Sequence, residues 1–354
     1  MNILILTGKF GFGHFSAAQA IRERILLEHP TYNVEVIDFL TYMYPKMSHF
    51  IYGIFNCLVN RYHALYNLVG GISSHNKSVF LKRTMAKRID DLLKNKKANA
   101  VISTLPICSQ YISAYKKMFR SSIVLNTFVT DIAINEEWIS EKTDLYFVPS
   151  FRTRDYLVKK NVPHYKIVVS GIPTKASFQA KKKQSKEKRI LIMGGGLGLI
   201  PCADEFLEFL SSVQHLKITL IVGSNEKMFH KYNQKYANVE VIGFTSEVYK
   251  YMQDADLIIT KAGGITLFEA IQSETPLFVI KPFLKQEIGN AKFIQDKNIG
   301  EVVWHKRESL MMDILSMLRD ESKLAGLRHN MRIIKAKLEQ DSFLINVGKR
   351  GIIC

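Results

Sequence analysis

The sequence has few cysteines, and they form no recognisable pair. The four cysteines of this 354-residue chain stand at positions 57, 108, 202 and 354, without any C-x-x-C spacing. This spacing excludes the zinc-ribbon pattern and a dense disulfide framework. We therefore expect buried or incidental thiols in a reducing cytoplasm.

Long hydrophobic runs are also lacking. The longest charge-free stretch, residues 98–115, is interrupted by Ser, Thr, Gln, Asn and Pro106, whereas a spanning helix needs about 18 or more predominantly apolar residues. The N-terminal MNILILTG has neither the basic region nor the cleavage site of a signal peptide. We expect neither export nor a membrane-spanning helix.

Acidic residues are scarce. The chain has 32 Asp and Glu against 49 Lys and Arg, a net charge of +17, with 47% hydrophobic residues. This apolar content excludes wholesale disorder. The charge predicts an anionic partner, which could be nucleic acid, a membrane surface or an acidic small molecule. No RNP-type aromatic motif, zinc finger or helix-turn-helix signature supports nucleic acid.

Short apolar runs alternate with helical periodicity, which favours parallel α/β domains. The first series of predicted strands covers residues 2–7, 33–39, 98–104, 121–130 and 144–150. The second series covers 188–198, 217–223, 238–244, 255–264 and 275–283, the first and fourth of these running into glycine turns. The sequence thus predicts two Rossmann-like halves in tandem, in agreement with roughly 100 to 200 residues per domain.

A basic segment separates the two series. Residues 175–189, KASFQAKKKQSKEKR, have almost no apolar content, as is typical of a solvated linker. We predict an N-terminal domain over 1–175, a linker over 176–188, a C-terminal domain over 189–310 and closing helices over 311–354.

The first glycine-rich turn is GKFGFGH. Gly8, Gly11 and Gly13 allow a ligand to approach a helix N-terminus, where free N–H groups favour an anion. The spacing is neither the dinucleotide pattern nor a Walker motif. His14 follows directly, at the mouth of the first strand, so it is either a general base or a capping or exposed side chain.

Two further segments have polar or glycine-rich turns. Gly194, Gly195 and Gly196 could cradle a phosphate or allow tight strand-to-helix packing. Gly263 and Gly264 open a predicted helix that contains Glu269.

The next predicted strand ends in an expected loop with Gln286, Glu287 and Asn290. Such polar groups suit a hydroxyl-rich ligand.

These residues carry a family resemblance that extends from residue 2 to about residue 300. The chain resembles the two-domain GT-B glycosyltransferases that glycosylate diacylglycerol, namely monogalactosyldiacylglycerol synthase and the bacterial processive diacylglycerol β-glucosyltransferases. A more distant resemblance is to the peptidoglycan lipid-linked N-acetylglucosaminyltransferase. The markers are G-x-G-H at 11–14, T-D-x6-W at 130–138, SGIP at 170–173, GGG at 194–196, K-x-G-G-x-T-x-x-E at 261–269 and Q-E-x-x-N at 286–290.

The resemblance implies a GT-B fold, with two parallel sheets facing a central cleft, and a role for each matching residue. It implies that His14 is the base that deprotonates the acceptor hydroxyl. The implied acceptor-side residues are Gly11, Gly13, Thr130, Asp131, Asn135 and Trp138.

The remaining implied residues bind a UDP-sugar, which is a substrate, so that no cofactor and no metal is expected. The implied contacts are Gly243 and Phe244 with uracil, Gly263, Gly264, Ile265 and Thr266 with the diphosphate, Glu269 with ribose, and Gln286 and Glu287 with the hexose, with Gly195 and Asn290 also on the donor side. In this family the helix N-terminus and nearby donors offset the leaving-group charge.

Two positions depart from the family pattern. Asn135 stands where the family usually has a histidine, which puts acceptor choice in question. Leu284 and Lys285 replace the family's Pro-Gly before Gln286 and Glu287, so the turn loses a glycine and a lysine stands beside the sugar subsite.

An aromatic and aliphatic segment over 40–70 is followed by a basic one over 76–97. Together they suit a surface that enters lipid while cations meet anionic headgroups, or else an apolar core or dimer interface beside a solvated helix face. Residues 1–177 hold 23 basic and 12 acidic residues, so the N-terminal half is the more basic. With the resemblance, we expect a peripheral location on the cytoplasmic face of the cell membrane.

The expected function is that of an inverting glycosyltransferase. It would move a hexose, glucose in preference to galactose, from a UDP-sugar to diacylglycerol or a glycolipid. The alternatives are N-acetylglucosaminyl transfer to an undecaprenyl-linked acceptor and a non-catalytic nucleotide-sugar sensor or scaffold.

Overall fold

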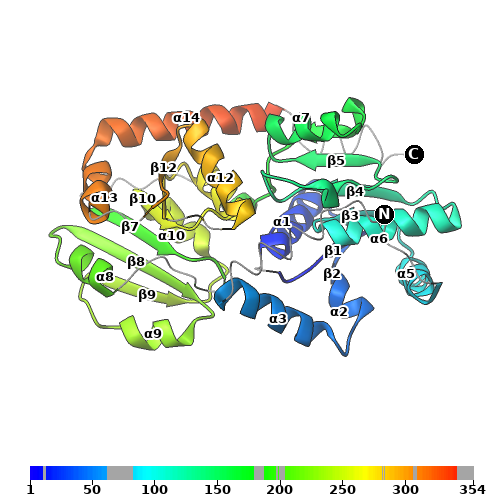
Figure 1. The fold of residues 1–354 in the computed structure, drawn as a ribbon, viewed down its shortest axis with the longest axis horizontal. Coiled ribbons are helices and arrows are strands. Elements are labelled where there is room, and N and C mark those ends of the chain that lie inside the picture. Colours follow the sequence, from blue (N-terminus) through cyan, green and yellow to red (C-terminus); the bar gives the residue numbers. More distant parts are fainter. Residues whose placement is uncertain are drawn as a thin grey trace. The chain divides into compact units, whose positions relative to one another are not determined.

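The chain forms two compact units (Figure 1). A computed structural model describes residues 1–10, 13–61, 83–178, 187–196, 198, 204–280, 282, 284–305 and 309–340. Unit 1 consists of Met1–Ala176 with Leu338–Cys354, and unit 2 of Ser177–Lys337.

The sheet of unit 1 is parallel throughout. Its order is β2-β1-β3-β4-β5-β6, so the chain places β2 on one side of β1 and β3 on the other. Such a reversal is the switch point at which open α/β sheets bind ligands. The strands are β1 (Asn2–Thr7), β2 (Asn33–Asp38), β3 (Ala100–Ser103), β4 (Val124–Phe128), β5 (Leu145–Val148) and β6 (Ile167–Val169).

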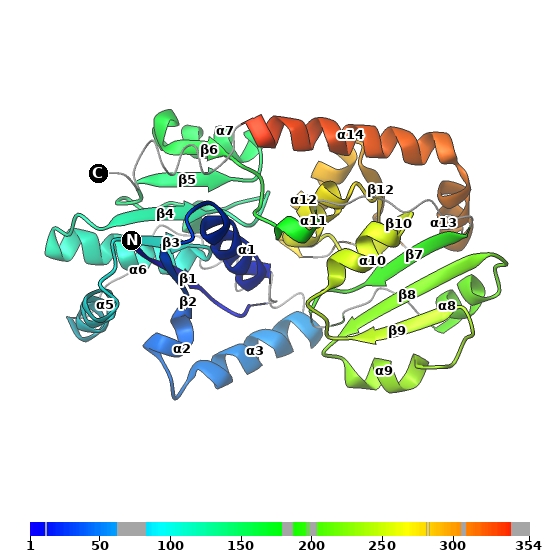
Figure 2. The same ribbon diagram turned by 180° about the vertical axis from the view of Figure 1, so that it is seen from behind.

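Helices cover both faces of this sheet. On one face, Ile21 and Ile25 of α1 pack against Ile3 and Ile5 of β1; α1 lies in front of the sheet in Figure 2. The other face packs against α2, α5 and α6. The helices are α1 (Gly13–Glu28), α2 (Phe39–Met43), α3 (Ser48–Arg61), α5 (Arg83–Asn95), α6 (Pro106–Phe119) and α7 (Phe151–Lys159), with short 3-10 turns η1 (Glu136–Trp138) and η2 (His164–Lys166), and η3 (Ala176–Phe178) at the unit boundary.

The sheet of unit 2 has the strand order of dinucleotide-binding folds. Its order is β9-β8-β7-β10-β11-β12, so that, counted along the chain from β7, it is 3-2-1-4-5-6. All its pairs are parallel, and its switch point lies between β7 and β10. The strands are β7 (Lys188–Met193), β8 (Leu216–Gly223), β9 (Val239–Gly243), β10 (Leu257–Thr260), β11 (Leu277–Ile280) and β12 (Gly300–Val303).

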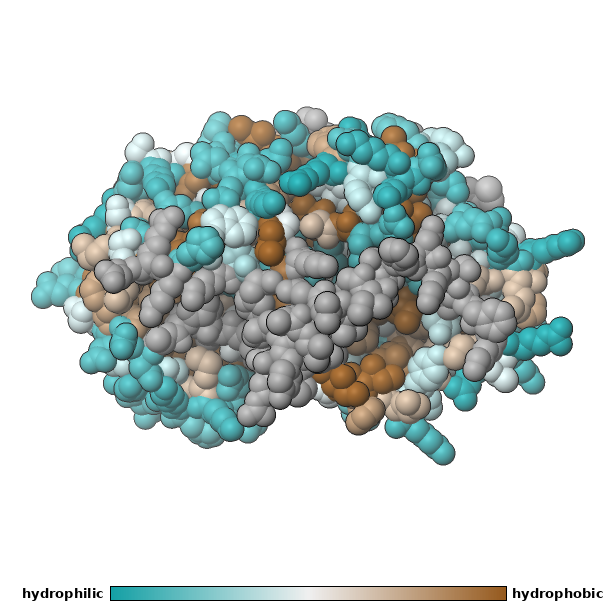
Figure 3. Space-filling view, viewed as in Figure 1, coloured by the Kyte–Doolittle hydropathy of each residue, from teal (hydrophilic) through white to brown (hydrophobic). Residues whose placement is uncertain are grey.

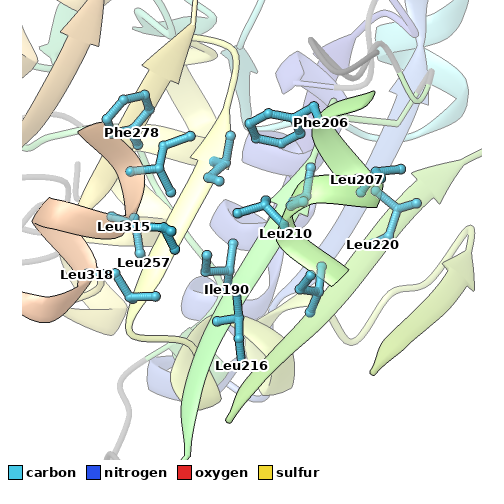
Figure 4. Close-up of a cluster of buried hydrophobic side chains, with 14 of the residues drawn as sticks. Ile190, Phe206, Leu207, Leu210, Leu216, Leu220, Leu257, Phe278, Leu315 and Leu318 are labelled. Atoms are coloured by element: carbon cyan, nitrogen blue, oxygen red, sulfur yellow. The ribbon is translucent and has the colours of Figure 1, made fainter. Parts of the chain in front are cut away.

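One face of this second sheet carries a large apolar cluster (Figure 4). Leu207 and Leu210 of α8 and Leu315 of α13 pack there against Ile190 and Leu257 of the strands. The cluster covers β7 and β10, the two strands on either side of the switch point. The helices are α8 (Asp204–Ser211), α9 (Glu226–Tyr232), α10 (Val248–Asp254), α11 (Gly264–Ser273), α12 (Lys285–Asp296), α13 (Leu310–Arg319) and α14 (Glu321–Gln340).

The predicted α/β fold class is confirmed, with one local error. The prediction that Gln286, Glu287 and Asn290 lie in a loop is wrong, because these residues lie on α12. Leu284 is extended and serves as the N-cap, and acidic Glu287 in the first turn suits the positive end of the helix dipole. Strands β6 and β12 were not expected.

Several predicted features lie wholly or partly outside the described residues. These are residues 179–186 of the predicted linker, residues 62–82, which include the end of the aromatic segment and the start of the basic one, and residues 341–354 of the predicted closing helices. Among the helices that the structure describes, none is both long and apolar enough to span a bilayer.

Candidate functional site

His14 lies at the switch point of unit 1. Strand β1 ends at Thr7 and α1 begins at Gly13, so His14 stands in the first turn of the helix that follows β1. The imidazole is half-buried. Gly11, which belongs to the same predicted turn, is outside the described residues.

The His14 side chain is held by residues that follow neighbouring strands. Its Nδ1 lies 2.7 Å from the Thr130 Oγ1, just after β4. The Trp138 ring is nearby, with ring centroids 6.3 Å apart. The Thr104 hydroxyl, after β3, lies 3.1 Å from the His14 carbonyl oxygen and 2.8 Å from the Thr7 hydroxyl. The carboxyl ends of three adjacent strands therefore fix this histidine.

The environment favours neutral His14. Burial lowers the pKa of the imidazole from its ordinary value of 6.5, and the Asp131 charge and a hydrogen bond with the Thr104 backbone only oppose this effect. Burial likewise raises the pKa of Asp131 from its ordinary value of 3.8, against the opposing influence of His14. A neutral imidazole at pH 7 can accept a proton, as a general base must.

Asn135 has a structural role in this region. Its Oδ1 accepts a hydrogen bond from the Glu137 backbone N–H at 3.2 Å and caps η1. This turn places Trp138, which is buried beside Val129 and Tyr146. The asparagine thus supports the segment that carries Trp138, one of the expected acceptor-side residues.

In unit 2, a glycine turn follows β7 at the switch point. Gly195 and Gly198 have positive φ values of 73° and 64°. A Cβ at Gly198 would stand 1.9 Å from the Val222 carbonyl oxygen. The Gly196 carbonyl accepts a hydrogen bond from Ser224 N at 3.0 Å, so this turn packs on the turn that follows β8. The close backbone approach explains why glycines stand here.

The N-terminus of α11 lies at the same switch point, directly after β10. Gly263 is its N-cap, and no side chain caps it. Free N–H groups at a helix N-terminus favour an anion. Gly264 and Ile265 begin the helix, Thr266 is buried, and Glu269 stands half-buried farther along the same helix.

The first turns of α12 support the loop before α11. The Asn290 Nδ2 donates a hydrogen bond to the Ala262 carbonyl oxygen at 2.9 Å. Glu287 is buried, and its Oε1 lies 3.6 Å from the Lys261 Nζ. Gln286, on the same helix, is half-buried. These contacts bring Glu287 and Asn290 together with the glycine segment 263–264 that the sequence also predicted.

The predicted uracil segment ends β9. Gly243 is the last residue of that strand, and Phe244 after it is 65% exposed. An exposed aromatic ring at the carboxyl edge of a sheet can stack on a planar base.

A surface cavity of unit 2 lies at the other end of the sheet. It is lined by residues that include Arg189, Lys217, Asn238 and Asp254, near the amino ends of β7 to β9. Because ligands of open α/β sheets bind at the carboxyl ends of strands, this cavity is not part of the candidate site. Within the described residues, no three His, Cys, Asp or Glu side chains form a metal-binding group.

Sequence reasoning missed three residues of the candidate site. Thr104 ends the predicted strand 98–104, and its place at a strand's carboxyl end could have identified it. Lys261 belongs to the K-x-G-G-x-T-x-x-E motif, but the motif alone indicates no role for it. Gly223 has a φ of 56° and packs on Gly196, a contact that only the folded chain reveals.

Comparisons with known proteins agree with this architecture. Residues 14–174 match the family model of monogalactosyldiacylglycerol (MGDG) synthase, and residues 189–341 match that of the glycosyltransferase family 28 C-terminal domain. The processive diacylglycerol β-glucosyltransferase of Bacillus licheniformis is 25% identical, over 99% of this chain and 96% of its own length. The enzyme of the same name from Bacillus subtilis is 26% identical, over 99% and 95%.

Solved structures show the same fold. MurG of Acinetobacter baumannii has a TM-score of 0.60 at 15% identity, with 96% of this chain and 98% of that chain covered. The spinosyn rhamnosyltransferase SpnG, complexed with thymidine diphosphate, has a TM-score of 0.59 at 11% identity, with 96% of each chain covered. The GT-B expectation is confirmed at the level of fold. Each half of the chain matches a family model, and the relatives match almost the whole chain. This protein therefore belongs to the MGDG synthase and glycosyltransferase family 28 group and is a glycosyltransferase.

Proposed function

We propose that the protein is an inverting hexosyltransferase that moves glucose, in preference to galactose, from UDP-glucose to diacylglycerol or a glycolipid. The observation that carries the proposal is the half-buried His14, held by Thr130 at the carboxyl edge of the sheet in unit 1. The choice of glucose and of diacylglycerol is supported by the full-length relatives named processive diacylglycerol β-glucosyltransferase.

In the proposed reaction, His14 accepts the proton of the acceptor hydroxyl. The acceptor oxygen then forms a bond to the anomeric carbon from the face opposite the diphosphate. The bond between that carbon and the phosphate oxygen breaks, and its electron pair leaves with UDP. Direct attack from the opposite face inverts the anomeric centre. The lowered pKa of His14 supports this role, because the base must be neutral before it takes the proton.

The donor is proposed to bind unit 2 at its switch point. The uncapped N-terminus of α11 at Gly263 and Gly264 supplies N–H groups for the diphosphate. Glu269 is proposed to accept hydrogen bonds from the ribose diol. Phe244 and the backbone of Gly243 are proposed to contact uracil, and Gln286 the hexose.

An exposed apolar surface supports docking to a membrane. Met47 directly precedes α3, and Phe50 and Ile54 lie on the helix. These three side chains are 55%, 67% and 45% exposed. Figure 3 shows hydrophobic side chains at the surface over α3. Spacings of three and four residues place the three on one face of the helix. We propose that this face enters the interfacial region of an anionic bilayer, where the acceptor lipid resides.

The test is a screen of three donors in vesicles that contain diacylglycerol and an anionic lipid. UDP-glucose, UDP-galactose and UDP-N-acetylglucosamine are each supplied, and lipid products are identified by mass spectrometry. Glucosyl-diacylglycerol as the main product supports the proposal. Transfer of N-acetylglucosamine to an added undecaprenyl-linked acceptor would contradict the proposal and favour an N-acetylglucosaminyltransferase. UDP binding without any lipid product would contradict it and favour a non-catalytic sensor or scaffold.

A further inference from the structure

Lys261 has no role in the site described so far, yet it lies at the centre of the switch point of unit 2. It follows β10 directly and stands two residues before the N-cap of α11. Its Cε lies 3.5 Å from the position that a Cβ would take at Gly195, in the turn after β7. The lysine side chain therefore lies against the glycine turn, on the side where open α/β sheets bind ligands.

The ammonium group is held by a buried carboxylate. The Lys261 Nζ lies 3.6 Å from the Glu287 Oε1, and the Glu287 side chain is only 4% exposed, against 25% for Lys261. Asn290, one turn farther along α12, bonds the Ala262 carbonyl and so fixes the backbone next to the lysine. A buried carboxylate beside a more exposed lysine orients the cation and leaves part of it accessible.

We propose that Lys261 binds the diphosphate of the nucleotide-sugar, and that Glu287 is a positioning residue that holds the ammonium group beside Gly195. The inference rests on the proposed UDP-sugar donor and gives Glu287 a different task from the hexose contact that the family resemblance implies. The uncapped N-terminus of α11 supplies only about half an elementary charge. The Lys261 ammonium beside it adds a cationic hydrogen-bond donor that suits a phosphate group, although Glu287 balances part of its charge.

The same charge would serve the transfer step. When the bond between the anomeric carbon and the phosphate oxygen breaks, its electron pair remains on the departing UDP. An ammonium group already placed beside that phosphate stabilises the added charge without a proton transfer. Removing it should therefore lower the rate of sugar transfer as well as the affinity for UDP.

The experiment compares the affinities of uridine, UMP and UDP by calorimetry, in the absence of any acceptor. Lys261→Met keeps the length of the side chain and removes its charge. We expect about a tenfold or greater loss of UDP affinity, a smaller loss for UMP and no change for uridine. Lys261→Arg should restore part of the UDP affinity. Lys292→Met, which changes an exposed lysine on α12, should bind all three ligands as the wild type does.

Two results would overturn the inference. One is wild-type UDP affinity in Lys261→Met, and the other is an equal loss of uridine and UDP affinity, which would indicate a purely structural effect. A double-mutant cycle tests the role of Glu287: replacing it by Gln should change UDP affinity in the wild-type background and leave it unchanged in Lys261→Met. The experiment measures no sugar transfer. It therefore tests the role of Lys261 even if the donor sugar or the acceptor differs from the one proposed above.

Discussion

The Nδ1 of His14 lies 2.7 Å from the hydroxyl oxygen of Thr130, a residue 116 positions later in the chain. The two side chains meet because β1 and β4 lie in one parallel sheet with only β3 between them, so their carboxyl ends share an edge. The hydrogen bond orients an imidazole that burial keeps largely neutral at pH 7.

Replacing Thr130 by Val should slow the transfer step. The change removes the hydroxyl that holds His14 and preserves the shape of the side chain. Losing one hydrogen bond of this kind predicts about a 3- to 10-fold lower kcat. Thr130→Ser keeps the hydroxyl and should retain most of the activity. Equal activity of the Val and wild-type enzymes would show that the contact does not position the base.

The pH profile of kcat/KM should report the protonation of His14. Burial lowers the pKa of this residue below 6.5, so the acid limb should lie below pH 6.5, and activity should be lost as His14 becomes protonated. Asp131 opposes this lowering, because its charge favours the imidazolium. Asp131→Asn should therefore shift the acid limb to still lower pH. A shift to higher pH would contradict the assigned electrostatics.

The glycine turn of unit 2 should not tolerate a side chain at Gly198. Its φ is 64°, and a Cβ would stand 1.9 Å from the Val222 carbonyl. Gly198→Ala should cost more than about 2 kcal/mol of stability. Gly326→Ala on α14 is the matched control, because nothing lies within 4 Å of its Cβ position. It should stabilise the protein by about 0.5–1 kcal/mol. Denaturant unfolding measures both changes.

The fold was largely predictable because several of its strands are short apolar runs that are buried on both faces of a sheet. NILILT of β1 and KRILIM of β7 stand out as buried strands from their composition alone. By contrast, β6 has only three residues and β12 begins with glycine and glutamate, so neither stands out from its surroundings. Segment KQEIGN begins with three polar residues, and its helical state depends on the packing of α12.

The candidate site was predictable only in part. The resemblance grouped His14 with Thr130, Asp131 and Trp138, and the structure brings them together. The contact between Lys261 and Glu287 was not foreseen, because it depends on where the first turn of α12 lies relative to the end of β10. Helix and strand patterns do not specify such a contact between side chains.

The apolar face of α3 should control vesicle binding. Replacing Met47, Phe50 and Ile54 by Ser removes exposed apolar area and should weaken binding to anionic vesicles by about tenfold or more. Changing Met312 and Ile333 to Ser, on α13 and α14, is the control and should have little effect. Binding should also weaken as salt rises. Vesicle sedimentation measures both, and unchanged binding of the triple variant would exclude α3 as the docking face.

The most direct test of the account is the rate at which glucosyl-diacylglycerol forms from UDP-glucose in anionic vesicles, measured for the wild type and for His14→Ala. His164→Ala, a change at an exposed histidine, is the control. The account predicts that the wild type and the control make the product and that His14→Ala is slower by about two or more orders of magnitude. No glucosylated lipid from the wild type, or equal rates for all three proteins, would contradict it.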